Sequence, residues 1–171
     1  MRKSLAFMLA VSVCAAAAAA PLLPSDWSTW TRTTDVVLNY RIPGHEDHFR
    51  VPYINEAGMK AAPRVKDGRV AWDYPRGTII LKEVFQGLSA PAAGEKPIRV
   101  YGMIKDPKNP KARGGWVWVV RDQATKKETV FESPLCIDCH SYANGPHTYG
   151  DKNPKGENRD FVYFTFVAKA P

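Results

Sequence analysis

Two cysteines and a histidine stand close together near the end of the chain, in the run Cys136-Ile137-Asp138-Cys139-His140. Two thiols three positions apart, with an imidazole directly after the second, form the attachment pattern of c-type haem. On a helix the thiols lie about one turn apart, so both can bond to the vinyl groups of one porphyrin while His140 binds the iron. The motif predicts one covalent haem c, with Cys136 and Cys139 as attachment residues and His140 as the metal ligand.

Two other kinds of site could use these residues. A structural zinc site would need a second pair of ligands, and the only other cysteine is Cys14, within the first twenty residues. A thioredoxin-like redox pair would need a βαβ setting, which this region lacks, and would not need the histidine. Haem attachment is therefore the favoured interpretation.

The beginning of the chain has the pattern of a secretory signal peptide. Residues 1–3 include two positive charges, an apolar run extends from Leu5 to Cys14, and six alanines follow at positions 15–20. The apolar run is too short for a stable membrane span. We expect residues 1–20 to be a signal peptide and residues 21–171 to form a single haem domain in the periplasm. Export agrees with the haem motif, because c-type haem is attached outside the cytoplasm.

Composition limits the classes of partner. The chain of 171 residues has a net charge of +7, which falls to +5 when Arg2 and Lys3 leave with the signal peptide. This charge is scattered along the chain, without a basic stripe interleaved with aromatic residues, so a nucleic-acid partner is not expected. About 150 mature residues suffice for one domain with a hydrophobic core. With Cys14 removed and the other two cysteines bound to haem, no disulfide can form.

The elements that must position the haem motif are mainly strands. Short helical turns are expected at 25–30 and 55–62, and Pro134 is well placed to open a helix carrying the haem motif. Residues 144–158 are rich in Gly, Pro, Asn and Lys and predict a long surface loop. We therefore expect an α+β fold, mainly an antiparallel β-sheet with a few short helices and a haem-binding helix near the C-terminus. The expected strands are Val36–Ile42, Phe49–Ile54, Thr78–Phe85, Ile98–Lys105, Trp116–Val120, Thr129–Phe131 and Phe161–Val167.

Lys82 lies in the middle of an otherwise apolar strand. By two-residue alternation its side chain shares a face with Ile80 and Val84. A buried ammonium without a partner is costly. From the residues alone, the favoured interpretation is a lysine on an edge strand that reaches solvent and blocks aggregation.

Three segments together resemble the cytochrome P-460 family, which includes the β-sheet cytochromes c′-beta. They are Phe49–Asn55, Tyr74–Glu83 with its Gly-Thr-strand-Lys-Glu order, and Gly115–Trp118, which leads to the haem motif and the ending Asp160–Tyr163. Members of this family are typically periplasmic dimers with an antiparallel sheet over the haem. The resemblance implies a homodimer, an open sixth position on the iron, and small nitrogen-containing molecules as ligands.

The same resemblance assigns roles to two basic residues. Lys82 matches the lysine that in some members bonds covalently to the haem, which reverses the edge-strand interpretation and makes Lys82 a cofactor-binding residue. Arg50 matches an arginine that lines the distal pocket, where it could stabilise anionic or dipolar ligands by charge-assisted hydrogen bonds. Members with a distal carboxylate oxidise hydroxylamine, and members with an apolar distal cap bind nitric oxide.

Neighbouring residues just upstream of the haem motif leave the activity open. If Glu132 faces the iron, its carboxylate can accept protons as electrons leave the substrate, and Glu132 and Arg50 would be the catalytic residues. If Phe131 faces the iron, the pocket is dry and suits nitric oxide. Adjacent strand residues point in opposite directions, so we expect only one of them to reach in. Trp118 is a further possible wall of the pocket.

Three functions therefore compete at the level of sequence. The first is oxidation of hydroxylamine or a similar small nitrogen species with an unidentified electron acceptor, the second is nitric-oxide binding without turnover, and the third is electron transfer with a sixth iron ligand. Candidates for that ligand are Met59, Met103 and His147. His45 and His48 could contribute to a metal site, but without a third ligand we expect a solvated loop there.

Overall fold

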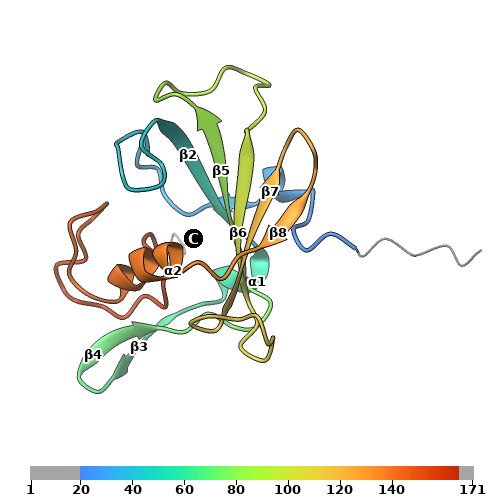
Figure 1. Cartoon of the computed structure of the whole chain (residues 1–171). Coiled ribbons are helices and arrows are strands. Elements are labelled where there is room, and N and C mark those ends of the chain that lie inside the picture. The colour runs from blue at the N-terminus through green and yellow to red at the C-terminus, as the bar shows by residue number, and fades with distance from the viewer. Residues whose placement is uncertain (1–19, 166–171) are drawn as a thin grey trace, which may run out of the picture.

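A computed structural model describes residues 20–165, which are organised around one six-stranded antiparallel sheet (Figure 1). The strand order is β1-β2-β5-β6-β7-β8, so the two edges are formed by very short strands. A separate hairpin of β3 and β4 extends away from the sheet. The strands are β1 (Thr31–Arg32), β2 (His48–Ile54), β3 (Pro63–Lys66), β4 (Arg69–Trp72), β5 (Ile79–Gln86), β6 (Arg99–Lys105), β7 (Trp116–Asp122) and β8 (Glu128–Val130).

The central strands are buried on both faces. In β7, Trp116 and Trp118 point to one face and join one hydrophobic cluster, whereas Val117 and Val119 point to the other and join a second. This follows from the two-residue side-chain period of a strand, and it explains why the first five residues of β7, Trp116–Val120, are continuously apolar. The tryptophan face is the one that carries the functional site.

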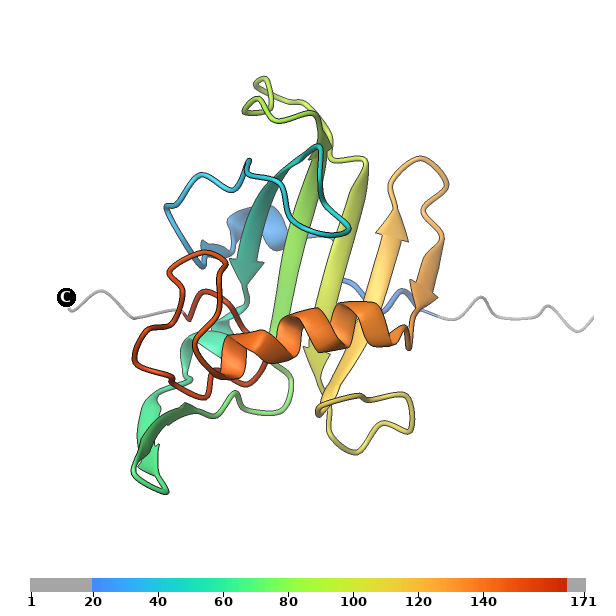
Figure 2. The ribbon, with the colours of Figure 1, turned by 60° about the vertical axis from the view of Figure 1, so that its left-hand side comes forward.

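Four short helices complete the described part of the chain. Helix α2 crosses the sheet on its tryptophan face, and Ile137 packs against the cluster that contains Trp116 (Figure 2). Pro134 occupies the first turn of α2, where its missing N–H is not needed. The helices are η1 (Trp27–Thr29), α1 (Glu56–Met59), α2 (Pro134–Ser141) and η2 (Tyr142–Asn144).

The long loop after η2 is fixed by the β3–β4 hairpin. The N–H of Trp72 donates to the carbonyl of Asn158 at 2.7 Å, and the N–H of Asn158 donates to the carbonyl of Val70 at 2.8 Å. The turn of the hairpin is Asp67-Gly68, with φ of 51° and 74°, and the short polar residue and the glycine tolerate this left-handed backbone. The predicted loop at 144–158 is thus an irregular segment with defined contacts.

Two predicted strands are wrong. Residues 36–42 make only one isolated bridge, between Leu38 and Arg50, because the Arg50 side chain takes the carbonyls of Leu38 and Tyr40. Residues 161–165 form a turn in which Phe161 has φ of 71°, a left-handed conformation that no strand accommodates. Residues 166–167 of that predicted strand lie outside the described residues.

The predicted fold class is confirmed, with a mainly antiparallel sheet, few short helices and a helix carrying the haem motif near the C-terminus. Residues 1–19 of the predicted signal peptide lie outside the described part of the chain. Within residues 20–165, no helix has the length and hydropathy needed to cross a bilayer.

Candidate functional site

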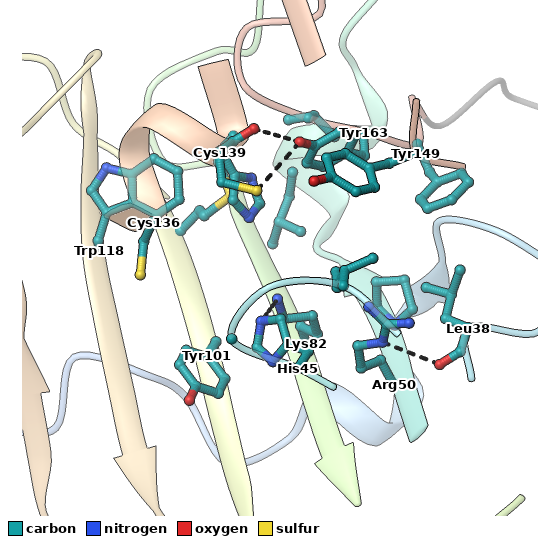
Figure 3. Close-up of a pocket in the computed structure, with 18 of the residues that line it drawn as sticks. Leu38, His45, Arg50, Lys82, Tyr101, Trp118, Cys136, Cys139, Tyr149 and Tyr163 are labelled. Atoms are coloured by element: carbon teal, nitrogen blue, oxygen red, sulfur yellow. Dashed lines mark hydrogen bonds between the residues drawn. The ribbon is translucent and has the colours of Figure 1, made fainter. Parts of the chain in front are cut away.

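A cavity lies between α2 and the tryptophan face of the sheet (Figure 3). About 190 Å³ of it is open to the centres of water-sized molecules. Such a concave site with a mainly apolar lining suits a large apolar cofactor with a few polar contacts. The apolar residues that line the cavity include Leu38, Ile80, Met103, Trp118, Phe131 and Val162.

Helix α2 presents both cysteines to the cavity. Cys136 and Cys139 are free, half-buried thiols, and both line the cavity. Because they are three residues apart on one helix, they follow each other by about one turn. The hydroxyl of Tyr163 donates to the carbonyl of Cys139, which ties the C-terminal segment to this helix. Two thiols beside one apolar cavity fit covalent attachment of haem c.

His140 is oriented by a backbone carbonyl. Its Nδ1 lies 2.9 Å from the carbonyl oxygen of Phe161, and since a carbonyl can only accept, Nδ1 carries the proton. Nε2 then keeps its lone pair. Burial lowers the pKa of His140 to about 4, and the charge of Lys82 acts in the same direction. A neutral imidazole with a free Nε2 is the form that binds iron.

Lys82 lies on the opposite side of the cavity from the cysteines (Figure 3). It belongs to β5, which pairs with β2 on one side and β6 on the other, so it is not an edge-strand lysine. Its Nζ lies 2.7 Å from Nε2 of His45 and 5.3 Å from the ring centroid of Tyr101. Burial, followed by the charge of Arg50, lowers the pKa of Lys82 to about 8.

His45 is the functional residue that sequence reasoning missed. Burial lowers its pKa to about 2, with further lowering by Lys82 and Arg50, so the imidazole is neutral and Nε2 accepts from the Lys82 amine. Its ring meets that of Tyr101 edge-on at 5.3 Å. The solvated loop expected at this position is wrong for His45. No local signal identifies it, because the loop reaches Lys82 only by folding back over β5.

Arg50 is buried in the same wall of the cavity. Its Nε donates to the carbonyl of Leu38 at 3.1 Å, and Nη2 donates to the carbonyl of Tyr40 at 2.5 Å. The guanidinium also stacks on the Tyr40 ring, 4.9 Å from its centroid. Burial lowers the pKa of Arg50. The side chain therefore brings a fixed positive charge to the cavity.

Phe131 and Glu132 point to different surroundings. Phe131 lines the cavity and meets the Tyr101 ring edge-on at 6.4 Å. Glu132 is not among the residues that line the cavity, and its partly exposed carboxylate pairs with Arg113. The structure thus brings Arg50, Lys82, Cys136, Cys139 and His140 together but leaves Glu132 apart. The role of Glu132 in proton acceptance stays a prediction.

The three candidates for a sixth iron ligand occupy different places. Met103 lines the cavity but belongs to the hydrophobic core. Met59 accepts a hydrogen bond from Thr31 at 3.2 Å, and neither Met59 nor His147 is among the cavity residues. His147 instead meets the Tyr163 ring edge-on at 5.0 Å.

The comparisons with known proteins agree with this geometry. Among curated proteins, no match was found. The family model described as Cytochrome P460 matches residues 24–164, a range that includes the sheet, the cavity and the complete Cys136–His140 motif. A match over most of the chain, on a fold that presents two thiols and an imidazole to one cavity, shows that this chain is a haem-binding cytochrome of the cytochrome P460 family.

Proposed function

We propose that the protein carries one haem c, bonded to Cys136 and Cys139 with His140 on the iron, and oxidises hydroxylamine or a similar small nitrogen species. The observation that carries this proposal is the placement of two sets of residues across one cavity. The thiols lie on one side, on the helix α2 that also carries His140, and Lys82, His45 and Arg50 lie on the other. The haem would supply the electron-accepting centre.

The polar wall opposite α2 supports binding of a small substrate with N–H and O–H groups. Arg50 offers a fixed positive charge that attracts the oxygen of such a molecule. Neutral His45 can donate a hydrogen bond from its Nδ1–H to the oxygen of such a molecule, because its Nε2 already accepts from Lys82. Oxidation removes protons as well as electrons, and the electrons pass on to an external acceptor. The Lys82 amine, whose pKa is lowered to about 8, is the group in this wall that can take up a proton near neutral pH.

Lys82 is proposed to contact the haem itself. Its Nζ projects into the cavity from β5, and its lowered pKa makes the neutral amine accessible near physiological pH. A neutral amine is the nucleophilic form. Its bond to a ring carbon would replace one N–H and one C–H bond, and would release two protons and pass two electrons to an external oxidant. The covalent bond between Lys82 and the haem, which the resemblance implies, does not depend on haem attachment through the cysteines.

Nitric-oxide binding without turnover is the second candidate. The observation that favours it is Phe131, which lines the cavity where a carboxylate had been considered. An apolar ring beside the open position would exclude water and favour a small neutral ligand. Electron transfer with a sixth protein ligand has less support, because Met103 is the only one of its three candidates that lines the cavity.

The setting of this activity is also a proposal. The pattern of the first twenty residues supports export to the periplasm, and the resemblance supports a homodimer. A periplasmic haem protein that oxidises its substrate needs an electron acceptor in the same compartment. We therefore propose an electron acceptor in the periplasm, whose identity the sequence does not specify.

The haem proposal is tested by mass spectrometry of the denatured protein. The haem mass is expected to stay with the parent chain and to be lost from the Cys136→Ala/Cys139→Ala variant. Extraction of haem from the parent by acid and organic solvent would contradict the proposal.

The optical spectrum tests the Lys82 bond and the open site. In the ferrous protein we expect a broad, red-shifted Soret band that Lys82→Met removes. A sharp low-spin spectrum would contradict an open site.

The activity is tested by hydroxylamine turnover with an artificial electron acceptor. His45→Gln is expected to lower the rate by about 10-fold, the size of one lost hydrogen bond, because the variant loses the imidazole that contacts Lys82 and the substrate. Glu132→Gln, at the surface pair with Arg113, serves as the matched comparison. Loss of turnover in Glu132→Gln with retention in His45→Gln would assign the proton-accepting role to Glu132. Binding of nitric oxide by a parent protein without turnover would favour the second candidate.

A further inference from the structure

Two consecutive residues after the long loop adopt a strained backbone. Asp160 and Phe161 have φ of 50° and 71°, in the left-handed region. Residues with a side chain adopt this region at a cost, and two in succession are uncommon. Such a conformation persists only where surrounding contacts hold it. Its position is notable because the carbonyl of Phe161 is the group that orients His140.

The carboxylate of Asp160 is held by groups from the sheet. Nζ of Lys105, in β6, donates to both carboxylate oxygens, at 2.9 and 2.7 Å. The indole N–H of Trp116, in β7, donates to Oδ1 at 3.2 Å, and the backbone N–H of Tyr74 adds a further hydrogen bond. The side chains of Lys105 and Asp160 are only 13% and 15% exposed. This ion pair is therefore a largely buried clamp between the sheet and the turn.

Phe161 is fixed as well. Its N–H donates to the side-chain oxygen of Asn144 at 2.9 Å. Its ring packs directly over Gly114, where an added Cβ would lie 2.5 Å from the ring. The ion pair of Asp160 and the packing of the Phe161 ring together fix the direction of the Phe161 carbonyl. Its oxygen lies 2.9 Å from Nδ1 of His140.

We propose that Asp160, clamped by Lys105 and Trp116, is a positioning residue for His140. Through the Phe161 carbonyl it sets the orientation of the imidazole and the electron donation of its Nε2 to the iron. A firm acceptor on Nδ1 makes the ring a stronger ligand, and residues that hold such acceptors tune metal sites. This inference rests on the proposed attachment of haem, with His140 on the iron.

The test measures the iron–histidine bond in the haem-loaded protein. In Asp160→Asn the lysine loses its ionic partner, so we expect the ferrous iron–histidine stretching band to shift to lower frequency and broaden. The midpoint potential is expected to rise, because a weaker donor stabilises ferric iron less. Lys105→Met should shift both in the same direction. The matched control is Asp106→Asn, which breaks the neighbouring ion pair with Arg76, 2.9 Å long, without touching the turn.

The outcomes separate this inference from the haem proposal. Absence of an iron–histidine band in the parent protein would contradict haem ligation by His140. A band that is present in the parent and unchanged in both Asp160→Asn and Lys105→Met, while their melting temperatures fall, would show that the clamp is merely structural. An equal shift in Asp106→Asn would also overturn the inference. If Asp160→Asn does not fold, Lys105→Met, which keeps the carboxylate and its other two donors, decides the question.

Discussion

At the scale of single residues, the cavity concentrates positive and neutral nitrogen groups without a carboxylate among its lining residues. Lys82 comes from β5, Arg50 from β2 and His45 from the loop before β2. Burial, followed by the charges of Lys82 and Arg50, keeps His45 neutral, and burial, followed by the charge of Arg50, lowers the pKa of Lys82 to about 8. Burial and the neighbouring positive charges lower the pKa of both His45 and Lys82, so the two effects reinforce each other.

The lowered pKa of His45 predicts a loss of stability on acidification. The unfolded chain binds a proton at His45 below pH 6.5, whereas the folded chain does so only near pH 2. Stability is therefore lost as pH falls through this window. Between pH 7 and pH 5 we expect a loss of about 1 to 2 kcal/mol from this group. Denaturant unfolding of the haem-loaded protein at the two pH values measures it.

His45→Gln should reduce this pH dependence while leaving a hydrogen-bonding partner for Lys82. The comparison variant is His147→Gln, in the C-terminal loop, which should keep most of it. An equal pH dependence in His45→Gln and in the parent protein would show that the imidazole does not titrate as described.

At the scale of elements, side-chain hydrogen bonds replace a strand that the sequence predicts. Residues 36–42 have the composition of a strand, yet Val36 and Val37 are exposed and only Leu38 bridges to β2. The Leu38 carbonyl accepts from both the backbone N–H and the side chain of Arg50, and the Tyr40 carbonyl accepts from the Arg50 side chain, so no continuous ladder forms. This arrangement brings an arginine and an apolar residue into the cavity wall together.

Arg50→Met is expected to destabilise the protein by about 2 to 4 kcal/mol. The substitution keeps much of the side-chain volume but removes the guanidinium's hydrogen bonds to the carbonyls of Leu38 and Tyr40. The Tyr40 carbonyl loses this donor, whereas the Leu38 carbonyl keeps the backbone N–H of residue 50. The measurement is the free energy of unfolding in denaturant. Arg41→Met is the matched control, because Arg41 pairs with Asp47 in solvent and such pairs contribute less than about 1 kcal/mol. Equal losses in the two variants would contradict the structural role of Arg50.

Periodicity predicts the central elements well, since β5, β6 and β7 each combine high strand propensity with bounding turns. The haem helix follows from the Cys136–His140 motif and Pro134. The wrong elements have tertiary causes. Residues 161–165 form a turn in which the Phe161 carbonyl contacts Nδ1 of His140, twenty-one residues earlier in the chain. His45 reaches the cavity through a loop whose path depends on its contact with Lys82 in β5. The choice between Phe131 and Glu132 depended on where β8 ends, which is one of the least defined features of a sequence.

At the scale of the whole molecule, residues 22–24 bind to strands β7 and β8 at one edge of the sheet. Leu23 is fully buried in the second hydrophobic cluster and lies against Gly102, where an added Cβ would be 2.4 Å from the leucine. Arg121 donates to the carbonyl of Leu23, and to that of Pro24 at 3.2 Å. Glu128 accepts from the N–H groups of Leu22 and Leu23 and pairs with Arg121.

This fastening has a consequence for the order in which the chain folds. The contact between Arg121 and Leu23 joins residues 98 positions apart, so closing the loop between them costs about 4 kcal/mol in chain entropy. We expect the β7–β8 hairpin to form first, because Arg121 and Glu128 come from its two strands. The first described residues of the chain are therefore among the last to be secured.

A contact that forms after the rate-limiting step slows unfolding more than it accelerates folding. Arg121→Met, which leaves Glu128 without its buried partner, is expected to cost about 3 kcal/mol and to raise the unfolding rate by about 10²-fold with little change in the folding rate. Stopped-flow kinetics in denaturant separate the two rates, with Lys60→Met, at the exposed pair with Glu56, as the control. We therefore expect the contacts of Leu22, Leu23 and Pro24 to set the unfolding rate of the folded cytochrome, and with it the lifetime of the native state.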